Sequence, residues 1–181
     1  MIKVLSIALT GFLSVSTAFA EGFTLSSPSV SGQLSISEVY NGFGCTGKNI
    51  SPELSWSNAP KGTKSFAVTM YDPDAPTGSG WWHWLVFNID VKTTTLKKGA
   101  GDPKSKIAPK GAIQSVTDYK SNGFGGACPP VGHGAHQYIF TVYALDTDKI
   151  ALDESANPAL VGYMINSHTL AKSSLIAYYR R

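Results

Sequence analysis

The sequence has little of what several specialised protein classes need. Only 15% of its 181 residues are charged and the formal net charge is +3, so no strongly basic surface for nucleic acid is expected. Beyond residue 20, no apolar run reaches the roughly 20 residues that a membrane-spanning helix needs. The chain also lacks a G-x-S-x-G motif, which argues against one common class of serine hydrolase.

The longest apolar stretch lies at the N-terminus. Lys3 is followed by an uncharged run from Val4 to Phe19, which closes on the small-residue pattern Ala18-Phe19-Ala20. This pattern is typical of a secretory signal peptide, so we predict that residues 1–20 are cleaved after Ala20. A membrane anchor is the alternative. Residues 21–181 are then long enough to form a single domain with a sizeable core.

Cysteine is scarce as well. Cys45 and Cys128 are the two cysteines of the chain, and both lie in the part predicted to be exported. An oxidising compartment would let them pair, so we predict one disulfide bond between them. The alternative is two unrelated free thiols.

Most of the remaining sequence indicates β-strands. Apolar and polar residues alternate over 65–70, and continuous or β-branched apolar runs cover 84–89, 136–145 and 173–179. The lysine-rich segment 92–111 is expected to be a surface connection. One amphipathic helix is predicted near the C-terminus, with Asn157 as its cap and Pro158 in its first turn. Its apolar stripe comprises Leu160, Val161, Met164, Ile165 and His168, the last expected in the core.

Two clusters of polar and aromatic residues are candidates for a functional site. The first, DPDAPTGSGWWHW, runs from Asp72 to Trp84, and the second, CPPVGHGAHQY, runs from Cys128 to Tyr138. Prolines restrict the backbone of both segments, and glycines allow sharp turns. Since each cluster adjoins a predicted strand, we expect the two to share one pocket. The tryptophans of the first cluster are expected mainly to pack in the core and at its rim.

These motifs, in this order, resemble the phosphatidylethanolamine-binding protein family, and the chain is similar to its bacterial Raf-kinase-inhibitor-like branch. NISPELSW, KSFAVTMYDPDAP, GWWHWLVFNI and FTVYALD extend the resemblance over most of the chain. It implies a mainly β fold, a β-sandwich of two antiparallel sheets with a C-terminal helix and short peripheral helices, and a small anion-binding pocket at one end. The ligand-binding residues that it implies are Asp72, Pro73, Asp74, Pro76, Trp82, His83, His136 and Tyr138.

The same residues suggest how such a pocket works. An aspartate beside a histidine favours the protonated imidazole, which could bind phosphate oxygens together with a tyrosine hydroxyl. One aspartate could also accept an ethanolamine ammonium. We therefore predict a periplasmic, or released, protein that binds phosphate or phosphoethanolamine-like groups, without catalysis and without a cofactor. Two features depart from the family or lack a counterpart in many members: Gln137 stands where arginine is common, and His133 has no inherited role.

Two other functions stay open at this stage. The resemblance includes regulatory proteins, so an inhibitor or regulator could act on a protein partner outside the cytoplasm through the same pocket and loops. His83, His136 and one aspartate could instead hold a catalytic metal ion, although their spacing is nonspecific and no metal site is predicted. The aromatic loops are also compatible with a homodimer.

Overall fold

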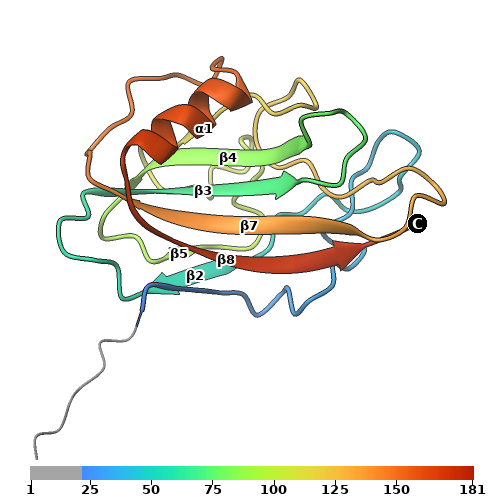
Figure 1. Ribbon diagram of the computed structural model, residues 1–181, viewed down its shortest axis with the longest axis horizontal. Helices are drawn as coiled ribbons and strands as arrows, with labels where there is room; N and C mark the ends of the chain where they lie inside the picture. The colour runs from blue at the N-terminus through green and yellow to red at the C-terminus, as the bar shows by residue number, and fades with distance from the viewer. Residues whose placement is uncertain (1–21) are drawn as a thin grey trace, which may run out of the picture.

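The computed structural model describes residues 22–181, and the predicted signal peptide lies outside them. Eight strands and one helix follow one another along this part of the chain (Figure 1). Their bounds are β1 Thr24–Ser26, β2 Leu54–Ser57, β3 Ser65–Asp72, β4 Trp81–Asp90, β5 Thr95–Leu96, β6 Ile113–Gln114, β7 His136–Leu145, α1 Pro158–Ser167 and β8 Thr169–Tyr179.

The strands form two antiparallel sheets. One has three strands in the order β1-β2-β5, and the other has five in the order β6-β4-β3-β7-β8. This arrangement confirms the predicted fold of two antiparallel sheets with a C-terminal helix. In residues 22–181, however, α1 is the one helix, and turns replace the expected short peripheral helices. Glycine and proline interrupt connections such as segment 92–111, which prevents helical turns from propagating there.

Both faces of the five-stranded sheet are buried. The face toward the smaller sheet carries Phe66, Val68, Met70, Trp84 and Phe140, which pack against residues such as Leu54 and Trp56 of β2. The opposite face carries Ala67, Leu85, Phe87 and Leu145, which pack against Val161 and Ile165 of α1. Alternation in β3 and β7 therefore sorts apolar side chains between two cores. The result is three layers, with the five-stranded sheet in the middle (Figure 1).

The C-terminal helix begins as the sequence predicts. The Asn157 side chain accepts a hydrogen bond from the backbone N–H of Leu160 at 2.9 Å, and Pro158 occupies the first turn. The expectation that His168 lies in the core is wrong. It follows the last helical residue and remains partly exposed, and its Nδ1 lies 2.8 Å from a carboxylate oxygen of Asp146.

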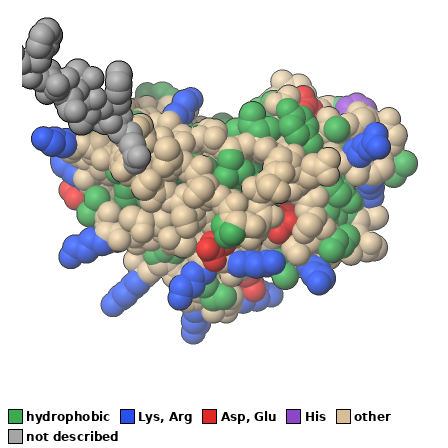
Figure 2. All heavy atoms as spheres, turned by 90° about the horizontal axis from the view of Figure 1, so that it is seen from below, with side chains coloured by type: hydrophobic (Ala, Val, Ile, Leu, Met, Phe, Trp, Pro, Cys, Tyr) green, Lys and Arg blue, Asp and Glu red, His purple; other side chains and the backbone are tan. Residues whose placement is uncertain are grey.

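The surface carries no single-sign patch on the face shown in Figure 2. Lysine and arginine side chains are spread around its periphery, and acidic side chains lie among them. Within residues 22–181, no helix is both long and apolar enough to cross a membrane.

Candidate functional site

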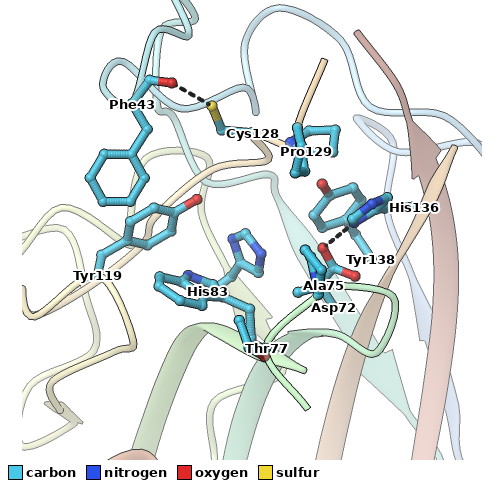
Figure 3. A pocket seen from close by; sticks show the side chains of 13 residues that line it. Phe43, Asp72, Ala75, Thr77, His83, Tyr119, Cys128, Pro129, His136 and Tyr138 are labelled. Carbon is cyan, nitrogen blue, oxygen red and sulfur yellow. Dashed lines mark hydrogen bonds and ion pairs between the residues drawn. The ribbon is translucent and has the colours of Figure 1, made fainter. Parts of the chain in front are cut away.

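A cavity of about 150 Å³ lies at one end of the five-stranded sheet (Figure 3). Antiparallel pairing brings the end of β3 and the starts of β4 and β7 together at this end of the sheet. Loops that carry Phe43, Tyr119 and Pro129 complete the walls. The lining residues are Phe43, Asp72, Ala75, Pro76, Thr77, Trp81, His83, Tyr119, Cys128, Pro129, Pro130, His136 and Tyr138.

The two sequence clusters do meet in this cavity. Of the eight predicted binding residues, five line it: Asp72, Pro76, His83, His136 and Tyr138. Pro73 and Asp74 are exposed and do not line it. A carboxylate oxygen of Asp74 instead accepts the backbone N–H of Gln137 at 2.7 Å, which ties the first cluster to the start of β7.

The assignment of Trp82 to the pocket wall requires correction, because Trp81 occupies that place. Trp82 lies on the opposite face of the sheet, where its ring centroid is 4.6 Å from that of Tyr71 and it packs against the helix at Gly162. The cause is a β-bulge: Met70 pairs with Trp84 and Tyr71 with Trp82, so His83 is an extra residue in β4. A bulge inverts the facing of the residues beyond it.

The bulge also places His83 and Trp84 on the same side of the sheet. Trp84 is fully buried in the core between the sheets, while His83 lines the cavity next to it. The loop that leads into β4 turns back at Gly80, whose φ is +67°. A side chain at this position would collide with the hydroxyl of Tyr71, so the close return of the loop requires glycine.

Asp72, His136 and His133 form a hydrogen-bonded chain. A carboxylate oxygen of Asp72 lies 2.8 Å from Nδ1 of His136, and Nε2 of His136 lies 2.8 Å from Nδ1 of His133. Asp72 and His136 are buried, whereas His133 is exposed. The second oxygen of Asp72 accepts the backbone N–H of Asp74 at 2.8 Å. Asp72 therefore orients His136 and also closes the turn after β3.

His83 is held differently. Its Nδ1 lies 2.7 Å from the carbonyl oxygen of Gly125. A carbonyl oxygen can only accept a hydrogen bond, so Nδ1 carries the proton and Nε2 of the neutral ring does not. Burial lowers the pKa of His83 to about 4, against the raising effects of the Gly125 hydrogen bond and the nearby charge of Asp72. His83 is therefore a neutral imidazole at physiological pH.

This burial predicts an acid-sensitive fold. His83 protonates near pH 6.5 in the unfolded chain but only near pH 4 in the folded one, so acid favours the unfolded state. We expect up to about 3 kcal/mol of unfolding free energy to be lost as pH falls from 6.5 to 4. Urea denaturation at a series of pH values measures this slope.

Two variants test whether His83 causes this dependence of the unfolding free energy on pH. The slope should diminish in His83→Phe and persist in His168→Phe, since His168 is partly exposed at the end of α1. A slope that is unchanged in His83→Phe would assign the acid sensitivity to other groups.

Two buried hydrogen-bonding groups of the cavity residues lack partners. The hydroxyl of Tyr138 and Nε1 of Trp81 are inaccessible to bulk solvent and contact no donor or acceptor within residues 22–181. Burial raises the pKa of Tyr138, as does the charge of Asp72, so the hydroxyl stays protonated and able to donate. Such unsatisfied groups are rare in folded proteins, and a cavity that gathers two of them is suited to a ligand that accepts hydrogen bonds.

The disulfide predicted from the sequence is present between Cys45 and Cys128, with 6.0 Å between the Cα atoms. Cys128 lines the cavity, and Phe43, two residues before Cys45, lines it from the opposite loop. The bond therefore joins two walls of the cavity.

Sequence reasoning missed Tyr119 and Phe43. Tyr119 forms an aromatic wall with Trp81 and His83, at ring-centroid distances of 5.3 and 5.4 Å. Its hydroxyl donates to the carbonyl of Gly126 at 2.9 Å. Neither residue lies in a recognisable motif.

Within residues 22–181, no group of three or more histidine, cysteine, aspartate or glutamate side chains is placed to hold a metal ion.

Comparison with known proteins assigns this two-sheet fold to a family. Residues 19–180 match the Phosphatidylethanolamine-binding protein family. The YbcL protein of Escherichia coli is 53% identical over 147 residues, which are 81% of this chain and 80% of YbcL. The YbhB protein of the same organism is 50% identical over 78% of this chain and 88% of its own length.

Solved structures agree. The crystal structure of Escherichia coli YbcL, described as a member of the mammalian PEBP family, matches with a TM-score of 0.86 and 50% identity. The match covers 88% of this chain and 98% of that one. A phosphatidylethanolamine-binding protein homologue from Chlamydia trachomatis, CT736, matches with a TM-score of 0.69 and 27% identity, over 88% of this chain and 97% of that one. The chain belongs to the phosphatidylethanolamine-binding protein family.

Proposed function

We propose that this protein binds a small phosphate-containing ligand in the cavity at the end of the five-stranded sheet. The observation that carries the proposal is the pair of unpartnered donors, the Tyr138 hydroxyl and the Trp81 indole N–H, at one cavity. Phosphate oxygens accept hydrogen bonds in several directions and would satisfy both donors once the neighbouring side chains shift enough to uncover these buried atoms. A volume of about 150 Å³ suits a tetrahedral anion with a short substituent, not a drug-sized molecule.

The negative charge of Asp72 does not oppose this proposal. Its two oxygens accept hydrogen bonds from His136 and from the backbone of Asp74. The hydrogen bond to Nδ1 of His136 fixes the orientation of that ring in the cavity wall. The side chain therefore supports the cavity wall rather than competing with the ligand for donors.

Binding without a chemical step fits the cavity best. Cys128, the sulfur-containing residue of the lining, is held in the disulfide. The ring nitrogens of His136 contact Asp72 and His133, and Nδ1 of His83 contacts a backbone carbonyl. No serine or free cysteine lines the cavity within residues 22–181 to act as a nucleophile beside these histidines.

We also propose that the protein acts outside the cytoplasm. The disulfide between Cys45 and Cys128 is compatible with an oxidising compartment, where such bonds persist. The N-terminal pattern Ala18-Phe19-Ala20 supports export, with cleavage after Ala20. Mass spectrometry of the protein purified from a periplasmic extract would test both points, since cleavage leaves Glu21 as the first residue.

Replacing Tyr138 by phenylalanine tests the proposed role of its hydroxyl. The change removes a donor to the ligand, so we expect phosphate affinity to fall roughly 5- to 30-fold, the equivalent of about 1 to 2 kcal/mol. The stability of the ligand-free protein should stay equal or rise, because the buried hydroxyl has no partner to lose. Isothermal titration calorimetry and urea denaturation measure the two effects.

Tyr143→Phe provides the matched control. Tyr143 lies in the same strand but packs in the core beside α1, on the other side of the sheet. Its replacement should leave phosphate affinity unchanged. If Tyr138→Phe binds phosphate as tightly as the unmodified protein, the ligand does not occupy this cavity in the manner proposed.

A further inference from the structure

The cavity contains a hydrogen-bond acceptor as well as donors. Nδ1 of His83 donates to the carbonyl of Gly125, which leaves Nε2 with a lone pair. His83 is buried in the cavity wall, where its ring lies between Tyr119 and Asp72 (Figure 3). A bulge in β4 holds the ring in this orientation. A bound ligand therefore faces an acceptor at one point and donors at others.

A ligand that only accepts hydrogen bonds leaves such a buried lone pair unsatisfied. A fully ionised anion would, in addition, be repelled by it. A ligand with one proton on an oxygen satisfies the acceptor through that proton and the donors through its other oxygens. Buried acceptors of this kind discriminate strongly, because the wrong ligand leaves a polar group without a partner.

We propose that His83 is a specificity-determining residue that selects anions carrying a proton, namely phosphate monoesters and inorganic phosphate, over sulfate and phosphodiesters. The inference rests on the proposed binding of phosphate in this cavity. Sulfate carries no proton near neutral pH, and neither does a phosphodiester. The cavity therefore fits a free phosphate monoester better than the phosphodiester of an intact phospholipid.

The other ionisable groups around His83 do not supply the missing proton. Asp72 at the end of β3 has both oxygens engaged, and a carboxylate oxygen of Asp118 accepts the backbone N–H of Trp82. Tyr119 donates its hydroxyl to Gly126. Tyr138 and His136 reach the cavity from β7, but the hydroxyl of Tyr138 makes no hydrogen bond to His83, and Nδ1 of His136 points to Asp72. The ligand is then the source of the proton for Nε2.

Calorimetric titration of the unmodified protein near pH 6 tests the selection directly. Inorganic phosphate and phosphoethanolamine should bind, and sulfate and dimethyl phosphate should bind roughly 10- to 100-fold more weakly. Equal affinity for phosphate and sulfate would overturn the inference while leaving the proposed function intact. Absence of binding by every ligand would overturn both.

Glycerophosphoethanolamine distinguishes the two ligand groups that could donate to His83, a phosphate O–H and an ammonium. Its phosphodiester has no proton, but its ammonium group could donate to His83 instead. Weak binding of this compound supports selection by the phosphate proton. Binding as tight as that of phosphoethanolamine would overturn this assignment and favour a phospholipid head group.

The pH dependence separates the proton of the ligand from those of the protein. Methylphosphonate loses its last proton at higher pH than methyl phosphate, and monofluorophosphate loses it at lower pH; inorganic phosphate is left out of this series because its dianion still carries a proton. If the bound form carries the proton, the pH at which affinity falls should follow this order. A midpoint that is the same for all three ligands would place the titrating group on the protein and contradict the inference.

A variant completes the test. His83→Phe removes the acceptor while keeping a ring, so the ratio of phosphate to sulfate affinity should fall to near one. His168→Phe, at the far end of α1, should keep the ratio of the unmodified protein. An unchanged ratio in His83→Phe would overturn the assignment, and the ligand series decides the question even if this variant does not fold.

Discussion

Replacing His136 by alanine is expected to abolish stabilisation by phosphate and to lower the free energy of unfolding by about 3 kcal/mol. The change removes a cavity residue, and it takes from the buried carboxylate of Asp72 the donor at 2.8 Å. A buried carboxylate that has lost a partner is costly. Thermal unfolding with and without phosphate, together with urea denaturation, measures both effects.

A double variant separates stability from binding. Asp72→Asn in the His136→Ala background removes the uncompensated charge, so stability should recover in part while phosphate binding stays lost. His133→Ala is the milder comparison, because His133 is exposed and contacts His136 from outside the lining. A phosphate-induced thermal shift that survives in His136→Ala would defeat the proposed binding site.

Loss of the disulfide is the second change with a large expected effect. Cys45 and Cys128 are 83 residues apart, and opening a loop of this length costs at most about 4 to 5 kcal/mol in the chain-entropy model. The bond also joins cavity walls that carry Phe43 and Pro129, so phosphate affinity should fall as well. Urea denaturation and phosphate titration, each with and without reductant, measure these effects.

The double variant Cys45→Ser with Cys128→Ser is the matched control for reduction. It should reproduce the stability of the reduced protein and show no further response to reductant. If reduction and the double variant leave stability unchanged, the bond does not constrain the unfolded chain as the entropy argument requires.

The long strands β3, β4, β7 and β8 and the meeting of the two clusters could be predicted because they depend on patterns within short segments; the short strands β1, β2, β5 and β6 were not predicted. Alternation of apolar residues identified β3, and β-branched and aromatic residues identified β7 and β8. Antiparallel pairing of β3 and β7 then placed Asp72 and His136 at the same end of the sheet. The cap at Asn157 was equally visible, because its side chain acts on the helix that directly follows.

The orientation of side chains at the start of β4 could not be predicted in the same way. Strict alternation would place Trp82 and Trp84 on one face and His83 on the other. The bulge at His83 exists because of how β3 and β4 pair, and no local residue pattern records it. Tyr119 was missed for a similar reason, since a distant loop brings it to the cavity. His168 was misplaced because the helix ends just before it, which lets the side chain turn to Asp146.

The strand β4 contains a second irregularity near Asn88, which adopts φ of 57° and binds the backbone of Ile150 through its side-chain amide. One extra residue in β4 reverses the faces on which the following side chains lie, and a second extra residue reverses them back. The side chains from Trp84 to Phe87 therefore lie on the faces opposite to those that strict alternation along the strand would give them. Deletion of His83 alone would remove the bulge and the cavity imidazole, while Trp82 would still pair with Tyr71 and Trp81 with Asp72. A one-residue change in chain length is thus a route by which this fold could lose or gain a binding-site residue without shifting the register of its strands.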